Sequence, residues 1–288
     1  MTTHDDRGRH PLDTGCPPEW ASAWGHDHFG VFVEFRVGDV DQRMRWIRPG
    51  IFLMGSPPDD AQAYGDEHPQ HLVRITTGFW LADTPVTQAL WQAITGENPS
   101  HFRGDPRRPV EQVSWDDCQH FCAQLQGLVP GPPFHLPTEA EWEYACRAGT
   151  AEATYADKLK LSLDDIAWYN RNSGGETHPV REKAPNPWGL YDTLGNVREW
   201  CSDRSYRSYS ESGDGESNSN SNRDRSSSPA LPDPQGPATG GYRVFRGGSW
   251  YGHARGVRAA YRHANGPGYR SGNLGLRLAR EQGVRQDP

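Results

Sequence analysis

Cysteine thiols are among the most reactive side chains in this sequence, and their spacing limits what they can do. The 288-residue chain holds five cysteines, at positions 16, 118, 122, 146 and 201. The number is odd and no pair has CxxC spacing, which argues against a disulfide framework and against a zinc ribbon. Cys118 and Cys122 share one face of an expected helix, and no further ligand is spaced to join them. We therefore expect buried free thiols.

Side-chain oxygens gather in an irregular stretch between residues 166 and 203, interleaved with Gly and Trp. Convergent carboxylates and amides are the ligands that a hard cation such as Ca²⁺ prefers. The same residue types also form ordinary turns, so spacing alone gives a weak signal. The donors are Asn170, Asn172, Asp192, Asn196 and Glu199.

The segment 251–273 has an unusual composition. It contains no Asp, Glu, Lys, Gln, Met or Trp, while Gly, Ala, Asn, His, Tyr, Ser and four Arg recur. A stretch needed only for packing would show an apolar period, and this one does not. A β-like run, 242–245, precedes the segment, and Leu274, Leu276 and Leu278 alternate after it as an expected half-buried strand.

The elements that must position this segment can be predicted from local signals. Phe29, Val31, Val33 and Phe35 alternate with polar residues, and strand patterns continue to about residue 82, so the front of the chain is β. A first helix is expected from Thr87 to Gly96. A second is capped by Ser114, with Asp117 three residues later, and a third starts at a Thr138/Glu141 capping box and ends at Gly149.

Composition excludes several function classes. The net charge is −7, and the sequence pI is near 5.9, so the overall field does not favour nucleic acid or anionic membranes. No run approaches the ~20 apolar residues of a membrane helix, and the N-terminus lacks the apolar core of a signal peptide. We expect a cytoplasmic monomer that neither binds nucleic acid nor inserts into membranes.

The domain organisation follows from two polar stretches. Residues 1–17 are expected to be disordered. Residues 204–238 are low in complexity and rich in Ser, Asn, Asp and Gly, so they cannot bury enough surface to offset their ordering entropy. We expect them to form a mobile insert within a single domain that covers residues 18–288.

Several motifs, in order, resemble the formylglycine-generating enzyme (sulfatase-modifying factor) family, over roughly residues 46 to 280. They are FLMGS, TPVTQALWQAITGENPS, PVEQVSWDDCQHFCAQL, LPTEAEWEYACRAGT, NPWGLYDTLGNVREWCSD and RVFRGGSW. The resemblance implies an α+β fold of the irregular C-type lectin-like type, with short antiparallel sheets, a few helices and much loop. It also implies a structural Ca²⁺ near Asn196 and Glu199, within the family's G-N-x-x-E-W element.

The resemblance does not carry over the family's oxidase activity. Oxidases of the family hold copper with two cysteines, three and eight positions beyond the Ser of the RGGS motif. Those positions here are Gly252 and Val257, and no cysteine follows Cys201, whereas Cu(I) requires thiolates. HExxH is also absent, and His253 and His263 alone do not form a facial triad for iron. We therefore expect no copper, no iron and no catalytic residues.

Another branch of the family explains the composition of segment 251–273. The segment resembles the variable region of proteins diversified by diversity-generating retroelements, in which Asn codons of a template are altered at adenines. Such codons can become Tyr, His, Gly, Ser or Ala, but never Trp, Lys, Glu, Gln or Met. Twelve residues, which we call the exchangeable positions, fit this set. They are Tyr251, Gly252, His253, Gly256, His263, Ala264, Asn265, Gly266, Tyr269, Ser271, Gly272 and Asn273.

The resulting hypothesis is a non-catalytic ligand-binding protein that presents a diversified surface to a partner, most simply a protein or another macromolecule. Tyr, His, Asn, Ser and Gly suit such a site because adaptable binding loops use the same residues. The arginines at 246, 258, 262 and 277 are expected to bond loop carbonyls or carboxylates such as Glu199. Two alternatives remain open: a fixed binding or structural module, and an oxidase or oxygenase with a non-standard site.

Overall fold

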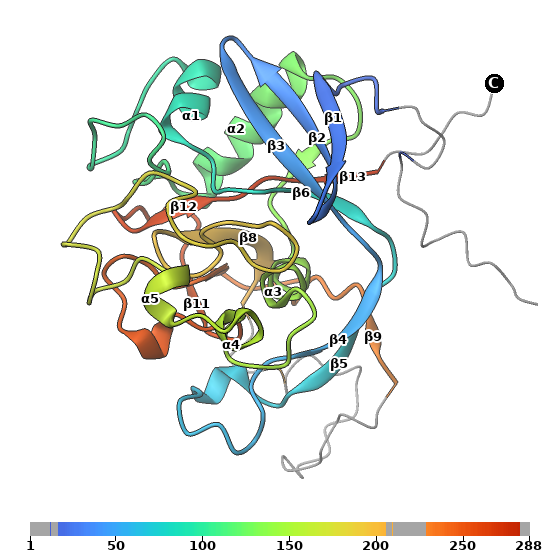
Figure 1. Cartoon of the computed structure of the whole chain (residues 1–288), viewed down its shortest axis with the longest axis vertical. Coiled ribbons are helices and arrows are strands. Elements are labelled where there is room, and N and C mark those ends of the chain that lie inside the picture. Colours follow the sequence, from blue (N-terminus) through green and yellow to red (C-terminus); the bar gives the residue numbers. More distant parts are fainter. Residues whose placement is uncertain (1–11, 13–16, 206–208, 210–228, 283–288) are drawn as a thin grey trace, which may run out of the picture.

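The computed structural model describes residues 12, 17–205, 209 and 229–282. A six-stranded sheet runs in the order β1-β2-β3-β6-β13-β7 (Figure 1). Its strands are β1 Ala23–Asp27, β2 Gly30–Val37, β3 Val40–Ile47, β6 Phe79–Ala82, β7 Phe134–His135 and β13 Ala279–Glu281. Val31, Val33 and Phe35 of β2 are buried, which confirms the predicted alternation, while Phe29 lies before the strand and is half-buried.

The three predicted helices form where their capping signals stand. They are α1 Gln88–Thr95, α2 Trp115–Leu128 and α3 Glu139–Arg147. The side chains of Thr87, Ser114 and Thr138 each accept a backbone N–H in the first turn, and Asp117 and Glu141 complete reciprocal boxes. Leu90, Trp91, Cys118 and Phe121 then join the core of the six-stranded sheet.

Two details of the helices differ from the prediction. α3 ends at Arg147, and its C-cap, Ala148, takes the left-handed conformation (φ 46°), so the helix stops two residues before Gly149. Two helices that the sequence patterns did not indicate, α4 Ala156–Leu159 and α5 Leu163–Ile166, follow α3. Both are single turns, too short for an apolar period to reveal.

Two smaller sheets complete the fold, in the orders β11-β10-β8-β12 and β4-β5-β9. Their strands are β4 Gly50–Met54, β5 His71–Ile75, β8 Arg198–Arg204, β9 Leu231–Pro232, β10 Arg243–Arg246, β11 Arg262–Asn265 and β12 Leu274–Leu276. Most pairings are antiparallel, as predicted, but β12 runs parallel to β8 and β9 runs parallel to β5. The fold is therefore the predicted α+β mixture of short sheets, few helices and long loops.

The alternating run Leu274, Leu276, Leu278 is not half-buried, and that prediction was wrong. The residues between the leucines, Gly275 and Arg277, are buried as well. A Cβ at Gly275 would lie 2.3 Å from the carbonyl oxygen of Val110, so only glycine fits there. The charge of Arg277 can be buried because Glu199 neutralises it through an ion pair at 2.7 Å.

The two predicted disordered stretches lie largely outside the described residues. Within the described part, Leu12 is buried in the core. The ends of the 204–238 stretch also belong to the fold, because β9 pairs with β5 and Asp233 accepts the backbone N–H of Thr76 at 2.8 Å. The described cysteines, Cys118, Cys122, Cys146 and Cys201, are free and buried, as predicted, whereas Cys16 lies outside the described residues.

In the described ranges, no helix combines the length and the apolar composition that a membrane span requires.

Candidate binding face

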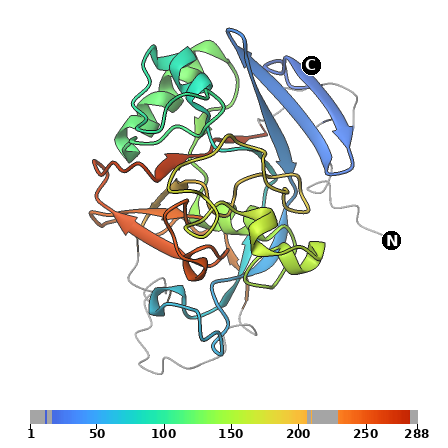
Figure 2. The ribbon, with the colours of Figure 1, turned by 60° about the vertical axis from the view of Figure 1, so that its left-hand side comes forward.

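The segment 251–273 is built on one edge of the four-stranded sheet. β10 leads into it, and β11 returns antiparallel to β10 in the register Arg243↔Asn265, Phe245↔His263 and Arg246↔Arg262. A long connection that contains a single 3-10 turn, Ala254–Gly256, joins these two strands. A second connection, 266–273, leads from β11 to β12 at the opposite edge of the sheet. Figure 2 shows the segment, in orange, on the left-hand side of the molecule.

Exposure separates the residues of this segment into two sets. None of the twelve exchangeable positions is buried; Tyr251 is 68% exposed and Tyr269 is 40% exposed. The buried residues of the segment all lie outside the twelve: they are Val257, Arg258, Ala259, Ala260 and Arg262. Side chains at the exchangeable positions can therefore change without removing core contacts.

Several bonds that hold the loops end on backbone groups, although the side chains of His253, Asn265 and Ser271 also form hydrogen bonds. Trp250 donates its indole N–H to the carbonyl oxygen of Gly272 at 2.8 Å. The backbone N–H groups of Gln112 and Trp115 donate to the carbonyl oxygens of Ser271 and Pro267, at 3.0 and 2.9 Å. Each of these loop bonds ends on a carbonyl group that every residue type carries.

The exchangeable positions form local groups. Trp250 links the start of the segment, Tyr251 to His253, to the 271–273 turn. Its ring packs against Tyr251, and its indole N–H bonds to Gly272. A separate group, His263, Ala264 and Asn265, lies on β11, where the His263 ring stacks on Phe245 at 5.1 Å. Gly266 and Tyr269 close the turn after β11 through a backbone bond of 3.0 Å, and Gly256 lies near Tyr261.

Beneath the segment lies a layer of buried arginines, Arg246, Arg258, Arg262 and Arg277, which we call the arginine layer. Arg262 bonds both oxygens of Glu139 at 2.7 Å. Arg258 bonds both oxygens of Glu67, at 2.6 and 2.7 Å. This confirms the structural role predicted for the four arginines.

Arg246 connects the arginine layer to the backbone of the segment. It donates to the carbonyl oxygens of Ala260 and Tyr261, at 2.6 and 2.7 Å, and forms an ion pair with Glu143. Burial alone would raise the pKa of Glu143, but Arg147 and Arg246 outweigh that effect and hold its pKa below the ordinary value. The carboxylate is therefore charged at neutral pH, and Arg246 and Glu143 belong to a buried network in which Arg147 and Glu139 are the further members.

The two predicted calcium ligands, Asn196 and Glu199, are buried and already bonded. Both Glu199 oxygens accept from Arg277, and one also accepts the indole N–H of Trp142 at 2.6 Å. The Asn196 amide bonds to the backbone of His178 in both directions. The guanidinium of Arg277 occupies the Glu199 carboxylate, where Ca²⁺ would have to bind. These two side chains therefore do not fit a calcium site. In the described ranges, no three His, Cys, Asp or Glu residues are arranged to hold a metal ion.

The two copper positions offer no thiolate. Val257 is fully buried among apolar residues, and Gly252 donates to and accepts from backbone groups of Ser249 and Asn170. Cys146 and Cys201 belong to the same apolar cluster as Val257, but burial raises the pKa of Cys146 to about 12 and that of Cys201 well above its ordinary value. Both thiols are buried in the core, and neither stands at one of the two copper positions.

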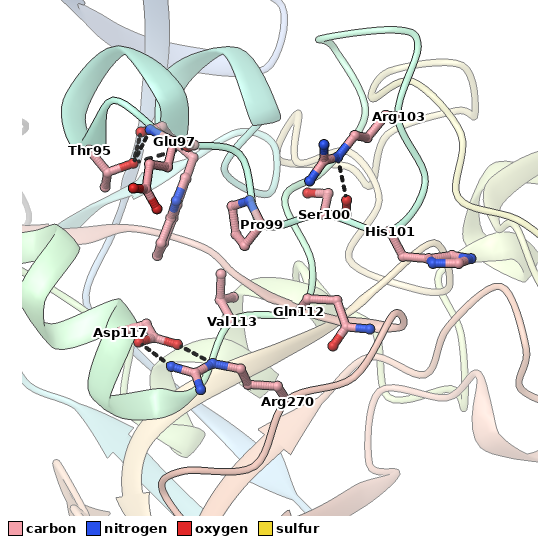
Figure 3. A pocket seen from close by; sticks show the side chains of 11 residues that line it. Thr95, Glu97, Pro99, Ser100, His101, Arg103, Gln112, Val113, Asp117 and Arg270 are labelled. Carbon is pink, nitrogen blue, oxygen red and sulfur yellow. Dashed lines mark hydrogen bonds and ion pairs between the residues drawn. The ribbon is translucent and has the colours of Figure 1, made fainter.

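Sequence reasoning missed a cavity of about 850 Å³ beside the segment (Figure 3). It is bounded by the loop after α1, the first turn of α2 and Arg270, which forms an ion pair with Asp117 at 2.7 Å. The lining residues are Trp91, Thr95, Glu97, Pro99, Ser100, His101, Arg103, Gln112, Val113, Asp117 and Arg270. No local pattern indicates this cavity, because it depends on how distant segments meet.

Comparison with known proteins identifies a family that the chain matches and an enzyme to which it is similar. Residues 29–282 match the model of the sulfatase-modifying factor enzyme 1-like domain. The formylglycine-generating enzyme of Streptomyces coelicolor is 34% identical over 268 residues, which cover 88% of this chain and 74% of that protein.

Solved structures with the same fold include variable protein 1 of Treponema denticola and PvdO of Pseudomonas aeruginosa. The first superposes with a TM-score of 0.70 at 32% identity and covers 86% of this chain and 98% of that one. The second has a TM-score of 0.71 at 25% identity and covers 86% and 97%. These matches confirm the fold predicted from the motifs.

Proposed function

The chain belongs to the sulfatase-modifying factor enzyme 1-like family, and on that basis we propose that it is a non-catalytic ligand-binding protein. Its binding surface is formed by the exchangeable positions, and its partner is a protein or another macromolecule. The structural likeness to a variable protein supports this proposal. A family scaffold without thiolates at Gly252 and Val257 argues for binding instead of oxidation.

The proposal rests on one separation: the exchangeable positions are exposed or half-buried, and the buried residues of the segment all lie outside them. A surface that changes its partner by mutation needs positions whose side chains contribute contacts but not stability. Tyr251 and Tyr269 supply rigid amphipathic area, while the Ser, Gly and Asn positions supply adaptable hydrogen bonding. Such a site has no motif for its ligand, and the lectin-like fold does not imply a sugar.

Two matched libraries test whether the exchangeable positions are free to vary. One library changes the twelve positions with adenine-altered Asn codons, and the other changes Val257, Arg258, Ala259, Ala260 and Arg262 in the same way. Both are displayed on phage and selected for protease resistance. We expect most members of the first library and few of the second to survive. Equal losses in both libraries would contradict the proposal.

Natural variation separates a diversified surface from a fixed module. The coding segment is sequenced in independent isolates of the source organism, together with its flanking DNA. We expect substitutions at the exchangeable positions, none at the buried ones, and a nearby copy of the segment with Asn codons. An invariant segment without such a copy would favour a fixed binding module.

The relationship to a formylglycine-generating enzyme favours one second candidate, an oxidase with a non-standard site. The purified protein would then consume oxygen when copper and a thiol-containing peptide are added. We expect no uptake above that of an Arg246→Ala control or of buffer. Peptide-dependent oxygen uptake would replace the binding proposal with the oxidase.

A further inference from the structure

Glu111, on the loop before α2, has a buried carboxyl oxygen that no described group satisfies. The side chain is fully buried, and its Oε1 accepts the backbone N–H of Phe102 at 2.7 Å. Its Oε2 has no hydrogen-bond partner among the described residues. An unsatisfied buried oxygen is costly, so a donor that reached it would add stability.

Gly272, one of the exchangeable positions, lies directly over this oxygen. A Cβ built on Gly272 would stand 3.6 Å from Glu111 Oε2, 3.8 Å from Phe102 Cε2 and 3.9 Å from Gln112 Nε2. These are ordinary contact distances, and the φ of Gly272 lies outside the left-handed region. Position 272 can therefore accept a side chain, and the first atoms of that side chain meet Glu111.

The direction of that side chain is fixed by neighbours that do not change. The indole N–H of Trp250 donates to the carbonyl oxygen of Gly272 at 2.8 Å. The backbone N–H of Gln112 donates to the carbonyl oxygen of Ser271 at 3.0 Å. The residues on both sides of the Cα are thus held by bonds to backbone oxygens. These bonds fix the direction of the Cα–Cβ bond at position 272, so the Cβ stays close to Glu111 Oε2 whichever χ1 rotamer the side chain takes.

We propose that Glu111 is a fixed partner of position 272 and decides which residues that position accepts. A short donor such as Ser places its hydroxyl within hydrogen-bond distance of Oε2. An Asp, which an altered Asn codon also encodes, places a second carboxylate against the first. The segment would thus be free to vary at its outer positions and restricted at 272. This inference rests on the proposed function only for the idea that 272 varies.

The charged surroundings of Glu111 support the argument. Burial is the main cause that raises its pKa to about 7, and Arg103 is the one side chain that lowers it. Arg103 itself donates to the carbonyl oxygens of Ser100 and Asn98, at 2.8 Å each, and not to the carboxylate. No nearby ion pair therefore offsets the repulsion from a second acid.

A double-mutant cycle tests the coupling without any ligand. Gly272→Asp and its neutral isostere Gly272→Asn are each made with Glu111 and with Glu111→Gln, and thermal unfolding is followed at pH 8 and pH 5. At pH 8 we expect Gly272→Asp to lower the Tm by several degrees more than Gly272→Asn does, since each roughly fivefold loss in the folding equilibrium constant lowers the Tm by about 2–4 °C. The excess should disappear with Glu111→Gln and shrink at pH 5, where Glu111 is protonated.

Equal effects of Gly272→Asp and Gly272→Asn in both backgrounds would overturn the inference. If Gly272→Asp does not fold, its rescue by Glu111→Gln supports the coupling, and failure of that rescue rejects it. Gly272→Ser provides a second arm, because it should raise the Tm only if its hydroxyl reaches Oε2. All these readouts concern the free protein, so they stand or fall separately from the proposed binding function.

Discussion

Arg262 and Arg270 belong to the same segment and form ion pairs of the same geometry in opposite surroundings. Each bonds both oxygens of one carboxylate at 2.7 Å, Arg262 with Glu139 and Arg270 with Asp117. The side chain of Arg262 is 2% exposed, whereas that of Arg270 is 54% exposed. Water screens the outer ion pair but not the inner one. Losing the inner pair should therefore lower the free energy of unfolding several-fold more than losing the outer pair.

The same contrast extends to the arginine layer and the exchangeable positions. Three residues of the arginine layer, Arg246, Arg258 and Arg262, hold the segment through buried ion pairs with Glu67, Glu139 and Glu143. The exchangeable positions face outward and contribute few bonds from their side chains. Arg258 and Arg262 belong to the segment itself. The segment can therefore carry variable side chains while its own buried residues anchor it to the fold.

The largest expected effect comes from breaking the inner pair. Arg262→Ala removes both close bonds to the buried Glu139 and leaves it with the longer ion pair to Arg246 at 3.3 Å, so we expect the free energy of unfolding to fall by about 3–5 kcal/mol. Urea denaturation measures the change. Because this variant could fail to fold, Arg262→Met with Glu139→Leu provides the control: removing both charges should restore most of the loss. A loss below about 1 kcal/mol would contradict the contrast.

The next effect concerns Glu111, whose folded pKa of about 7 exceeds the ordinary 4.5. The folded state keeps a proton that the unfolded state releases, so stability falls as pH rises from 4.5 to 7 and stays lower above that window. We expect Glu111→Gln to gain up to about 3 kcal/mol at pH 8 and little at pH 5. A gain that did not depend on pH would show that the carboxyl is not the cause.

In that experiment the difference between the two proteins isolates Glu111 from other acids. Burial also raises the pKa of Asp192 to about 6 and that of Asp203 to about 7. These groups titrate in both proteins, so their contributions cancel in the comparison. Urea denaturation at each pH supplies the two curves.

A smaller effect is expected from the outer pair. Arg270→Ala should lower the free energy of unfolding by about 0.2–1 kcal/mol, and added salt should reduce the loss further. Measured beside Arg262→Ala, it compares two similar ion pairs at different depths. A loss that equals the one for Arg262→Ala, or that salt does not change, would show that burial is not the deciding variable.

Exchangeable positions should affect stability least of all the side chains in the segment. We expect Tyr251→Ala and Tyr269→Ala each to change the free energy of unfolding by less than about 0.5 kcal/mol. Once a partner has been selected by display, the same variants should weaken its binding. Ala259→Tyr, at a buried neighbour, is the matched control and should destabilise the fold.

Chelation tests the calcium prediction at Asn196 and Glu199. Because Arg277 already occupies the Glu199 carboxylate, we expect EDTA to leave the Tm unchanged. Titration of Ca²⁺ into the chelated protein, followed by calorimetry, provides the complementary measurement. A fall in Tm on chelation that Ca²⁺ reverses would show that a calcium site exists and that its ligands lie elsewhere or rearrange.

Local signals predicted the helices because a cap and its partner are three residues apart, as in Ser114 with Asp117 and Thr138 with Glu141. The composition of segment 251–273 likewise set apart twelve positions, none of which is buried. Long-range features were not predictable in this way. The parallel pairing of β12 with β8, and the position of Glu111 beneath Gly272, depend on segments that only the folded chain brings together.

The placement of β13 between β6 and β7 has a consequence for how the protein is made. This interior strand follows the whole of segment 251–273 in the chain, so the ribosome delivers it after every exchangeable codon has been read. A frameshift in those codons removes β12 and β13 together and leaves the largest sheet without an inner strand. Faulty copies of the segment would thus yield chains that cannot fold, and quality control by proteases would discard them before they met a partner.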